Sequence, residues 1–243
     1  MKQSKLLLTT VLFAVAAVLP RMCYATGEAQ IVEIGGVEVS FPRPLGFSTA
    51  CQESALFAAA VVATTPSSSK LLTCWVETPT WEAFKSGMAQ SLYPLMIVTH
   101  APTLGNNWSQ LDFEKLKSRS KEELGVSAAN ETQSTQLQFE EQNTTFAKLG
   151  IPIEIGNFRR SFAGIFDATE TSFSYLIARE ATVTVQGVSR TDRECVAITR
   201  VMYAGNLIAL TVIERDTSQR SVNNAKDLSL QWRAQFLGAN TRP

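Results

Sequence analysis

Alternating apolar and polar positions predict strands in the first half of the chain. Val37, Val39 and Phe41 alternate with polar residues before a Pro- and Gly-containing turn, and Leu71–Glu77 and Leu95–Thr99 form apolar, partly β-branched runs. Glu53–Ala63 is rich in alanine, which favours a short helix, and a Pro and serine segment ends it.

The second half begins with a helix and a long polar stretch. Asp112–Leu124 has an apolar face, with Ser109 placed to cap its start and Gly125 to end it. Residues 126–148 are rich in Asn, Gln, Thr, Ser and Glu, which predicts a mobile polar excursion with at most an edge strand. Strands resume at Phe158–Phe166 and Phe173–Glu180.

A hairpin over Cys195–Glu214 is the clearest β signal. Gly205-Asn206 suits a tight hairpin turn, and a turn there sets Tyr203 opposite Ile208 and Val201 opposite Leu210. Both faces of this hairpin are largely apolar, which predicts a central position in the sheet.

The chain is expected to end in an amphipathic helix from Val222 to Leu237. Leu228, Trp232 and Phe236 repeat every four residues, and Ser221 and Gly238 are placed to begin and end it. The order of elements predicts an α+β fold: one layered domain, residues 26–243, with a mostly antiparallel sheet flanked by helices.

The N-terminus has the pattern of a secretory signal peptide. Two lysines precede the uncharged run Leu6–Leu19, and small residues follow, which predicts cleavage between Ala25 and Thr26. The run has 14 residues, whereas a membrane-spanning helix needs about 20, so an uncleaved anchor is the weaker alternative. A lipid anchor at Cys23 fits less well, because the residues before it are not small.

The charge balance disfavours nucleic-acid and anionic-membrane binding. Residues 1–25 hold three basic residues, so 19 basic and 22 acidic residues remain after cleavage, a formal charge of −3. No transmembrane segment is expected after cleavage.

Three cysteines remain after cleavage, and an oxidising compartment would let two of them pair. We favour a Cys51–Cys74 disulfide over a pairing of either with Cys195, because their loop is short. Three buried free thiols are the alternative. The leftover cysteine, Cys195, could also join two chains in a dimer.

The sequence offers no trusted catalytic, cofactor or metal motif. The single histidine, His100, leaves only a dyad with Cys195 or Cys51 on paper, and its simpler interpretation is a residue at a strand end. The sequence contains no Gly-rich phosphate loop and no Gly-x-Ser-x-Gly elbow. Tripeptides starting at Asn107, Asn130 and Asn143 fit N-glycosylation, which matters only in a eukaryotic source.

Two groups of side chains are candidates for partner contacts. Trp75, Trp81 and Tyr93 lie close together in sequence and could line a partner groove, although core packing is the simpler interpretation. The arginines of residues 151–220 would suit carboxylate recognition if they converged, although ordinary pairing with nearby acids explains them as well. These arginines include Arg159 and Arg160, and the group Arg190, Arg193 and Arg200.

The layout resembles the PsbP-like fold, which the photosystem II extrinsic subunit shares with a Ran-binding import factor and many exported bacterial proteins of unknown role. The resemblance lies in the opening strand and turn from Val37 to Phe47, the helix around Asp112, and the final hairpin and helix at Gly205 and Trp232. It covers most of residues 31–240 as order and spacing, and it carries over no functional residue. It implies a non-catalytic docking role.

We therefore expect an exported protein, periplasmic or secreted, that acts as an interaction module docking on another exported or envelope protein. Two alternatives remain at this stage. One is an extracytoplasmic hydrolase that uses carboxylates assembled in the fold, and the other is a small-ligand carrier.

Overall fold

The computed structural model describes residues 28–88, 91–102, 107–126, 132–185 and 187–241, and the side chains within 121–139 are not described. It has the α+β architecture expected from the sequence. Antiparallel pairing joins all neighbouring strands of a seven-stranded sheet. Their order is β3 (Phe47–Ser48), β4 (Lys70–Glu77), β5 (Leu95–His100), β9 (Asn206–Arg215), β8 (Val188–Tyr203), β7 (Ser172–Val185) and β6 (Ile153–Ala168).

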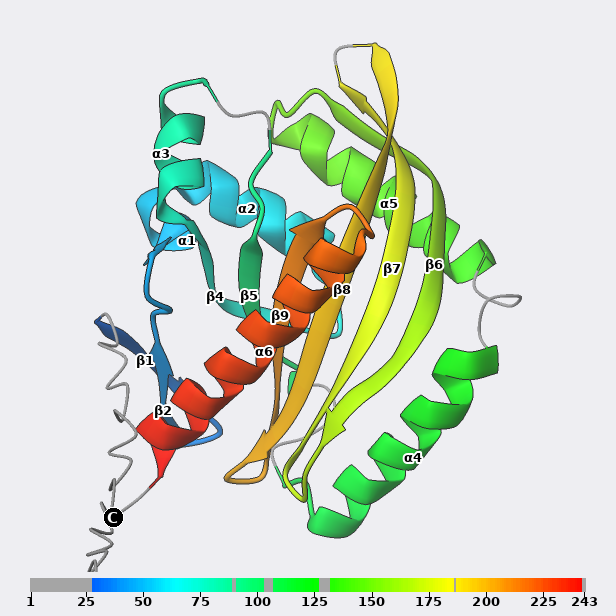
Figure 1. Cartoon of the computed structure of the whole chain (residues 1–243). Coiled ribbons are helices and arrows are strands. Elements are labelled where there is room, and N and C mark those ends of the chain that lie inside the picture. The colour runs from blue at the N-terminus through cyan, green and yellow to red at the C-terminus, as the bar shows by residue number, and fades with distance from the viewer. Residues whose placement is uncertain (1–27, 89–90, 103–106, 127–131, 186, 242–243) are drawn as a thin grey trace, which may run out of the picture.

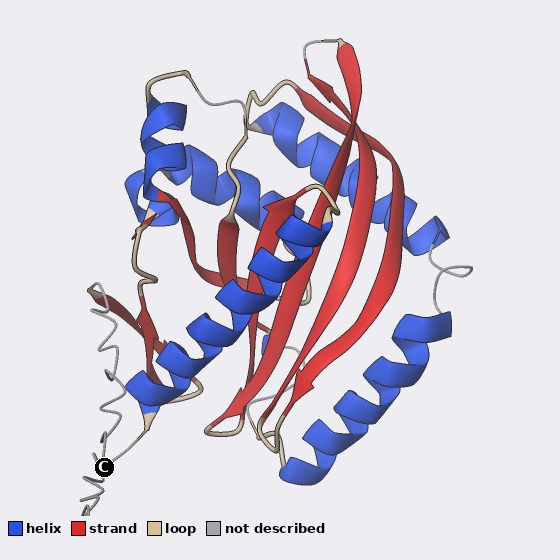
Figure 2. Cartoon of the chain, viewed as in Figure 1, coloured by secondary structure: helices blue, strands red, loops and turns tan. Residues whose placement is uncertain are grey.

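Helices cover both faces of this sheet (Figure 2). One face packs against α6 (Gln219–Asn240) and a separate hairpin of β1 (Ala29–Ile34) and β2 (Val37–Pro42). The other face packs against α1 (Ala50–Glu53), α2 (Ala55–Thr64), α3 (Thr78–Lys85), α4 (Gln110–Val126) and α5 (Thr132–Lys148). Figure 1 shows α6 lying across the strands on its side of the sheet.

The core under α6 is built on aromatic pairs. Trp232 meets Trp75 of β4 edge to face, with ring centroids 5.2 Å apart, and Phe236 stacks on Phe41 of β2 at 5.5 Å. The four-residue repeat of α6 therefore packs on the sheet as predicted. The predicted start and end of this helix are wrong. The N-cap is Ser218, whose side chain accepts from the Ser221 backbone N–H, and Gly238 lies inside the helix.

The β8–β9 hairpin is central as predicted, but its register differs. The turn residues are Ala204 and Gly205, both with positive φ, so Val201 pairs with Ile208 and Tyr203 with Asn206. The turn thus lies one residue earlier than predicted, and each partner shifts by two. Because side chains alternate with a period of two, every residue keeps its predicted face.

The prediction of a mobile polar excursion with at most an edge strand at residues 126–148 is wrong. This stretch contains the 17-residue helix α5 and no strand among its described residues. The Asn143 side chain accepts from the Ile155 backbone N–H at 2.8 Å and donates to the Ile155 carbonyl at 2.9 Å, which fixes α5 to β6. Phe146 and Gln142 are buried on the docked side. These few contacts stabilise a helix that local composition does not predict.

Candidate functional site

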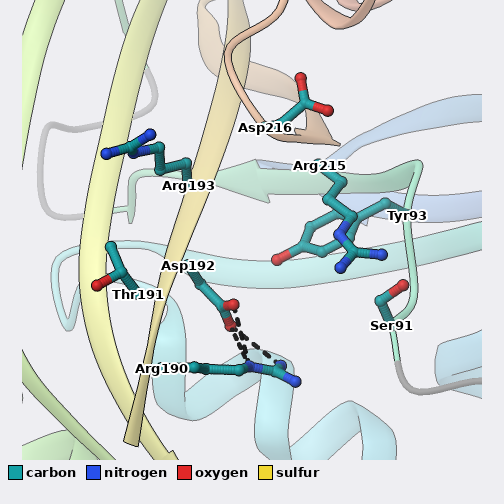
Figure 3. A pocket seen from close by; sticks show the side chains of 8 residues that line it. All are labelled: Ser91, Tyr93, Arg190, Thr191, Asp192, Arg193, Arg215 and Asp216. Carbon is teal, nitrogen blue, oxygen red and sulfur yellow. Dashed lines mark hydrogen bonds and ion pairs between the residues drawn. The ribbon is translucent and has the colours of Figure 1, made fainter.

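A cavity of about 400 Å3 opens at one end of the sheet, where the segment before β5, the start of β8 and the end of β9 meet (Figure 3). We call it the β8–β9 cavity. Its lining is mostly polar and comprises Ser91, Tyr93, Arg190, Thr191, Asp192, Arg193, Arg215 and Asp216.

Strand register brings charged residues of four strands into one row beside the cavity. Arg160 of β6 pairs with Arg179 of β7, Arg179 with Glu194 of β8, and Glu194 with Arg215 of β9. Residues paired in this way share a face of the sheet. The row therefore holds three arginines and one glutamate on the face that α5 covers.

Both carboxylate oxygens of Glu194 have a partner, one of them in this row. Its Oε1 accepts a hydrogen bond from the Tyr93 hydroxyl, and its Oε2 lies 2.6 Å from Nη2 of Arg179. Burial, and secondarily the Glu194 charge, raise the pKa of Tyr93 well above its usual range. Tyr93 therefore stays protonated and donates. The Nε donor of Arg179 is buried and has no hydrogen-bond acceptor among the described residues.

Most of the other charges at the cavity form ordinary ion pairs. Arg190 binds Asp192 through Nε and Nη2 at 3.0–3.2 Å, and Nε of Arg193 lies 2.7 Å from Glu180. This is the surface pairing that sequence reasoning considered. Arg215 is exposed and has no ion pair within the described part of the chain.

Two of the candidates for partner contacts, Trp75 and Trp81, do not lie on the surface, because both are almost fully buried. Trp75 packs on Trp232, and the Trp81 indole N–H donates to Glu53 at 2.7 Å. Core packing, the simpler interpretation, holds for both.

The remaining candidates are partly brought together. Tyr93 lines the cavity, and Arg160 belongs to the row beside it. Arg159 points to the opposite face, because successive strand residues alternate. Sequence reasoning missed Arg215, whose signal was its place at the end of a strongly apolar strand.

The predicted disulfide is confirmed. Cys51 and Cys74 are bonded, with their Cα atoms 5.3 Å apart, which joins α1 to β4. Cys195 is free and buried, and burial raises the pKa of its thiol to about 11. An intermolecular disulfide through Cys195 would therefore require β8 to open.

The dyads considered from the sequence, His100 with Cys51 or with Cys195, do not form. Cys51 is in the disulfide. In the strand register, Cys195 lies opposite Glu214 of β9, whereas His100 lies opposite Ile208, six positions away along the same strand. His100 is buried at the end of β5, and burial lowers its pKa. Within the described ranges, no group of three His, Cys, Asp or Glu residues could hold a metal ion.

The described residues contain no helix with the length and apolarity to span a membrane. The predicted cleavage site, Ala25 and Thr26, lies outside the described residues, as does Asn130.

Comparison with family models and with curated proteins gives no match. Among solved structures, the Ran-binding protein Mog1p of Saccharomyces cerevisiae aligns over 87% of this chain and 91% of its own, with 11% identity and a TM-score of 0.34. A mutant form of Mog1 gives the same identity and TM-score, over 87% and 92%. A likeness at this TM-score carries no argument, and the PsbP-like resemblance stays a prediction.

Proposed function

We propose that this protein is an exported, non-catalytic interaction module, periplasmic or secreted, that docks on another exported or envelope protein. The observation that carries the proposal is a set of exposed apolar side chains on α2 and at the end of α3. We call it the α2–α3 surface and define it by Leu56, Val62, Phe84 and Met88.

Helix α2 lacks the polar face that a surface helix ordinarily has. No charged residue occurs between Glu53 and Lys70, and Val61 is the buried residue of the helix. Leu56 and Val62 are 56% and 53% exposed. An apolar helix without a polar face is typical of a buried environment, so a partner that covers α2 would lower the free energy of the assembly.

Helix α3 packs against α2 and adds further exposed apolar side chains. The Phe57 ring of α2 lies 6.5 Å from the Phe84 ring, and Phe84 stacks on Trp81 at 5.6 Å. Phe84 is 41% exposed, and Met88, just beyond α3, is 78% exposed. Aromatic and methionine side chains are enriched at protein interfaces, which supports a protein partner.

Export is supported by the N-terminal pattern and by a disulfide that suits an oxidising compartment. The hydrolase alternative gains no support from the cavity, because Asp192 and Glu194 are both engaged by arginines. A carrier of apolar ligands gains none either, because the β8–β9 cavity is mostly polar. A PsbP-like fold remains part of this proposal.

Crosslinking of the tagged protein in its own host, followed by purification and mass spectrometry, tests the proposal. We expect a partner at near-equal abundance that is lost from the double variant L56D/V62D. The matched control is L111D/V188D, which changes a leucine and a valine that are 65% and 72% exposed on α4 and β8. Recovery of the protein alone, or equal loss in both variants, would contradict docking through this surface.

A further inference from the structure

Arg215 is the one arginine of the cavity lining without an ion pair among the described residues, although its charge helps to lower the pKa of the neighbouring Asp216. Arg215 stands opposite Glu194 on the neighbouring strand, where a cross-strand ion pair would ordinarily form. Both oxygens of Glu194 are instead directed to other partners, since Oε1 accepts from Tyr93 and Oε2 pairs with Arg179, and Glu194 and Arg215 form no ion pair.

The two aspartates of the cavity are engaged as well. Arg190 holds both carboxylate oxygens of Asp192. Asp216 accepts from the Ser218 backbone N–H at 2.7 Å, and Figure 3 shows the Arg215 side chain running away from Asp216. Arg215 therefore offers a whole guanidinium fork to the cavity.

Other cavity groups complement such a fork. In Figure 3 the guanidinium points toward the side where Ser91 and Tyr93 lie. The Ser91 hydroxyl can donate a second hydrogen bond to an anion, and the Tyr93 ring supplies an apolar wall. The Tyr93 hydroxyl is held by Glu194, so it is not available to a ligand.

We propose that the β8–β9 cavity binds a carboxylate group, with Arg215 as the principal ligand-binding residue. A guanidinium matches a carboxylate bidentately, with two parallel hydrogen bonds. The cavity volume of about 400 Å3 suits a small ligand or a chain terminus. This site lies on elements other than the α2–α3 surface, so it does not depend on the docking proposal.

Two-dimensional 1H–15N NMR titration of the purified protein with succinate, at constant ionic strength, tests the site. We expect saturable shifts centred on Arg190–Arg193 and Arg215. The variant Arg215→Gln is expected to bind about tenfold more weakly or worse, because charge-assisted hydrogen bonds are lost. The matched control Arg159→Gln removes the same charge from the opposite face of the sheet and should bind succinate like the original protein.

Neutral and anionic probes test whether binding requires the negative charge of a carboxylate. Succinamide, which has the same shape without the charge, should not bind. N-acetyl-dialanine and its C-terminal amide show whether a peptide terminus serves as the carboxylate source, and binding of the acid alone supports the proposal. Equal binding of succinate by Arg215→Gln, equal binding of succinamide, or tighter binding of inorganic phosphate than of succinate would each overturn it.

Discussion

Glu214 carries a carboxyl group into the space beneath α6. It is 7% exposed and accepts a hydrogen bond from the Asn224 amide of that helix. Burial raises its pKa, with a further contribution from the Glu77 charge, while the Asn224 hydrogen bond opposes the shift. The folded protein thus holds the Glu214 proton more tightly than the unfolded chain does.

Replacing Glu214 with Gln should stabilise the protein at pH 7, where the ionised carboxylate is a cost to the folded state. We expect Tm to rise, and for a chain of this length each 1 kcal/mol of stabilisation corresponds to about 2–4 °C. As pH falls from 7 toward the ordinary range of a glutamate carboxyl, Glu214 takes up its proton in the folded state first and the cost disappears. The Tm difference between variant and original should therefore shrink over that interval.

Thermal unfolding followed by circular dichroism at several pH values between 7 and 4 measures this effect. Glu33→Gln makes the same chemical change at an exposed position of β1 and should leave the pH profile unaltered. A Tm difference for Glu214→Gln that stays constant across the interval would contradict the assignment.

For single residues, the sequence predicted the disulfide pairing correctly but did not predict which aromatic side chains are buried. The short loop between Cys51 and Cys74 was sufficient to favour their disulfide. Nothing local indicated that Trp81 would be buried against Glu53 while Phe84, three residues later, stays exposed. Such differences depend on which helix covers which strand.

At the scale of elements, the disulfide is the covalent link between α1 and β4. It closes a loop with a sequence separation of 23 residues. In the chain-entropy model a loop of that length restricts the unfolded state by about 3.5 kcal/mol. The link also holds α1, and α2 directly after it, against the sheet.

The double variant Cys51→Ala, Cys74→Ala should therefore lose about 10 °C in Tm. Differential scanning calorimetry with and without a thiol reductant measures the loss. The reductant should lower the Tm of the original protein by a similar amount and leave that of the variant unchanged. Equal Tm values for the two proteins would show that the link does not stabilise the fold.

Elements with a strong local pattern were predictable, and elements stabilised by tertiary contacts were not. Helix α6 and the β8–β9 hairpin each concentrate apolar residues at one period, so their existence and faces could be derived. Helix α5 has a polar sequence and depends on Asn143 and Phe146 docking on its neighbours. The β8–β9 cavity was hidden for the same reason, since Arg215 and Tyr93 meet only through strand register.

At the scale of the whole molecule, β2 of the N-terminal hairpin is joined directly to the end of α6, the last described element. Asn240, at the end of α6, accepts from the Ser40 backbone N–H at 2.9 Å and donates to the Ser40 carbonyl at 2.7 Å. The contact spans 200 positions in sequence and fixes the β1–β2 hairpin, which is not part of the main sheet, to α6. Phe41 and Phe236 stack next to it. The hairpin therefore completes the core layer that α6 covers.

Asn240→Ala should loosen this closure and destabilise the whole fold. It leaves the N–H and C=O of Ser40 without their partner in a largely buried place, a loss of about 1–3 kcal/mol and thus of about 2–12 °C in Tm. Hydrogen exchange should accelerate at Ser40 and along β1–β2 before it accelerates in β8 and β9, because the hairpin is attached through α6 rather than through the sheet. Asn223→Ala removes an exposed asparagine from the same helix and should change neither measurement by a comparable amount. Uniform acceleration in the hairpin and in the sheet would instead mean that the two layers unfold as one unit, and Asn240 would then be an ordinary helix-end residue.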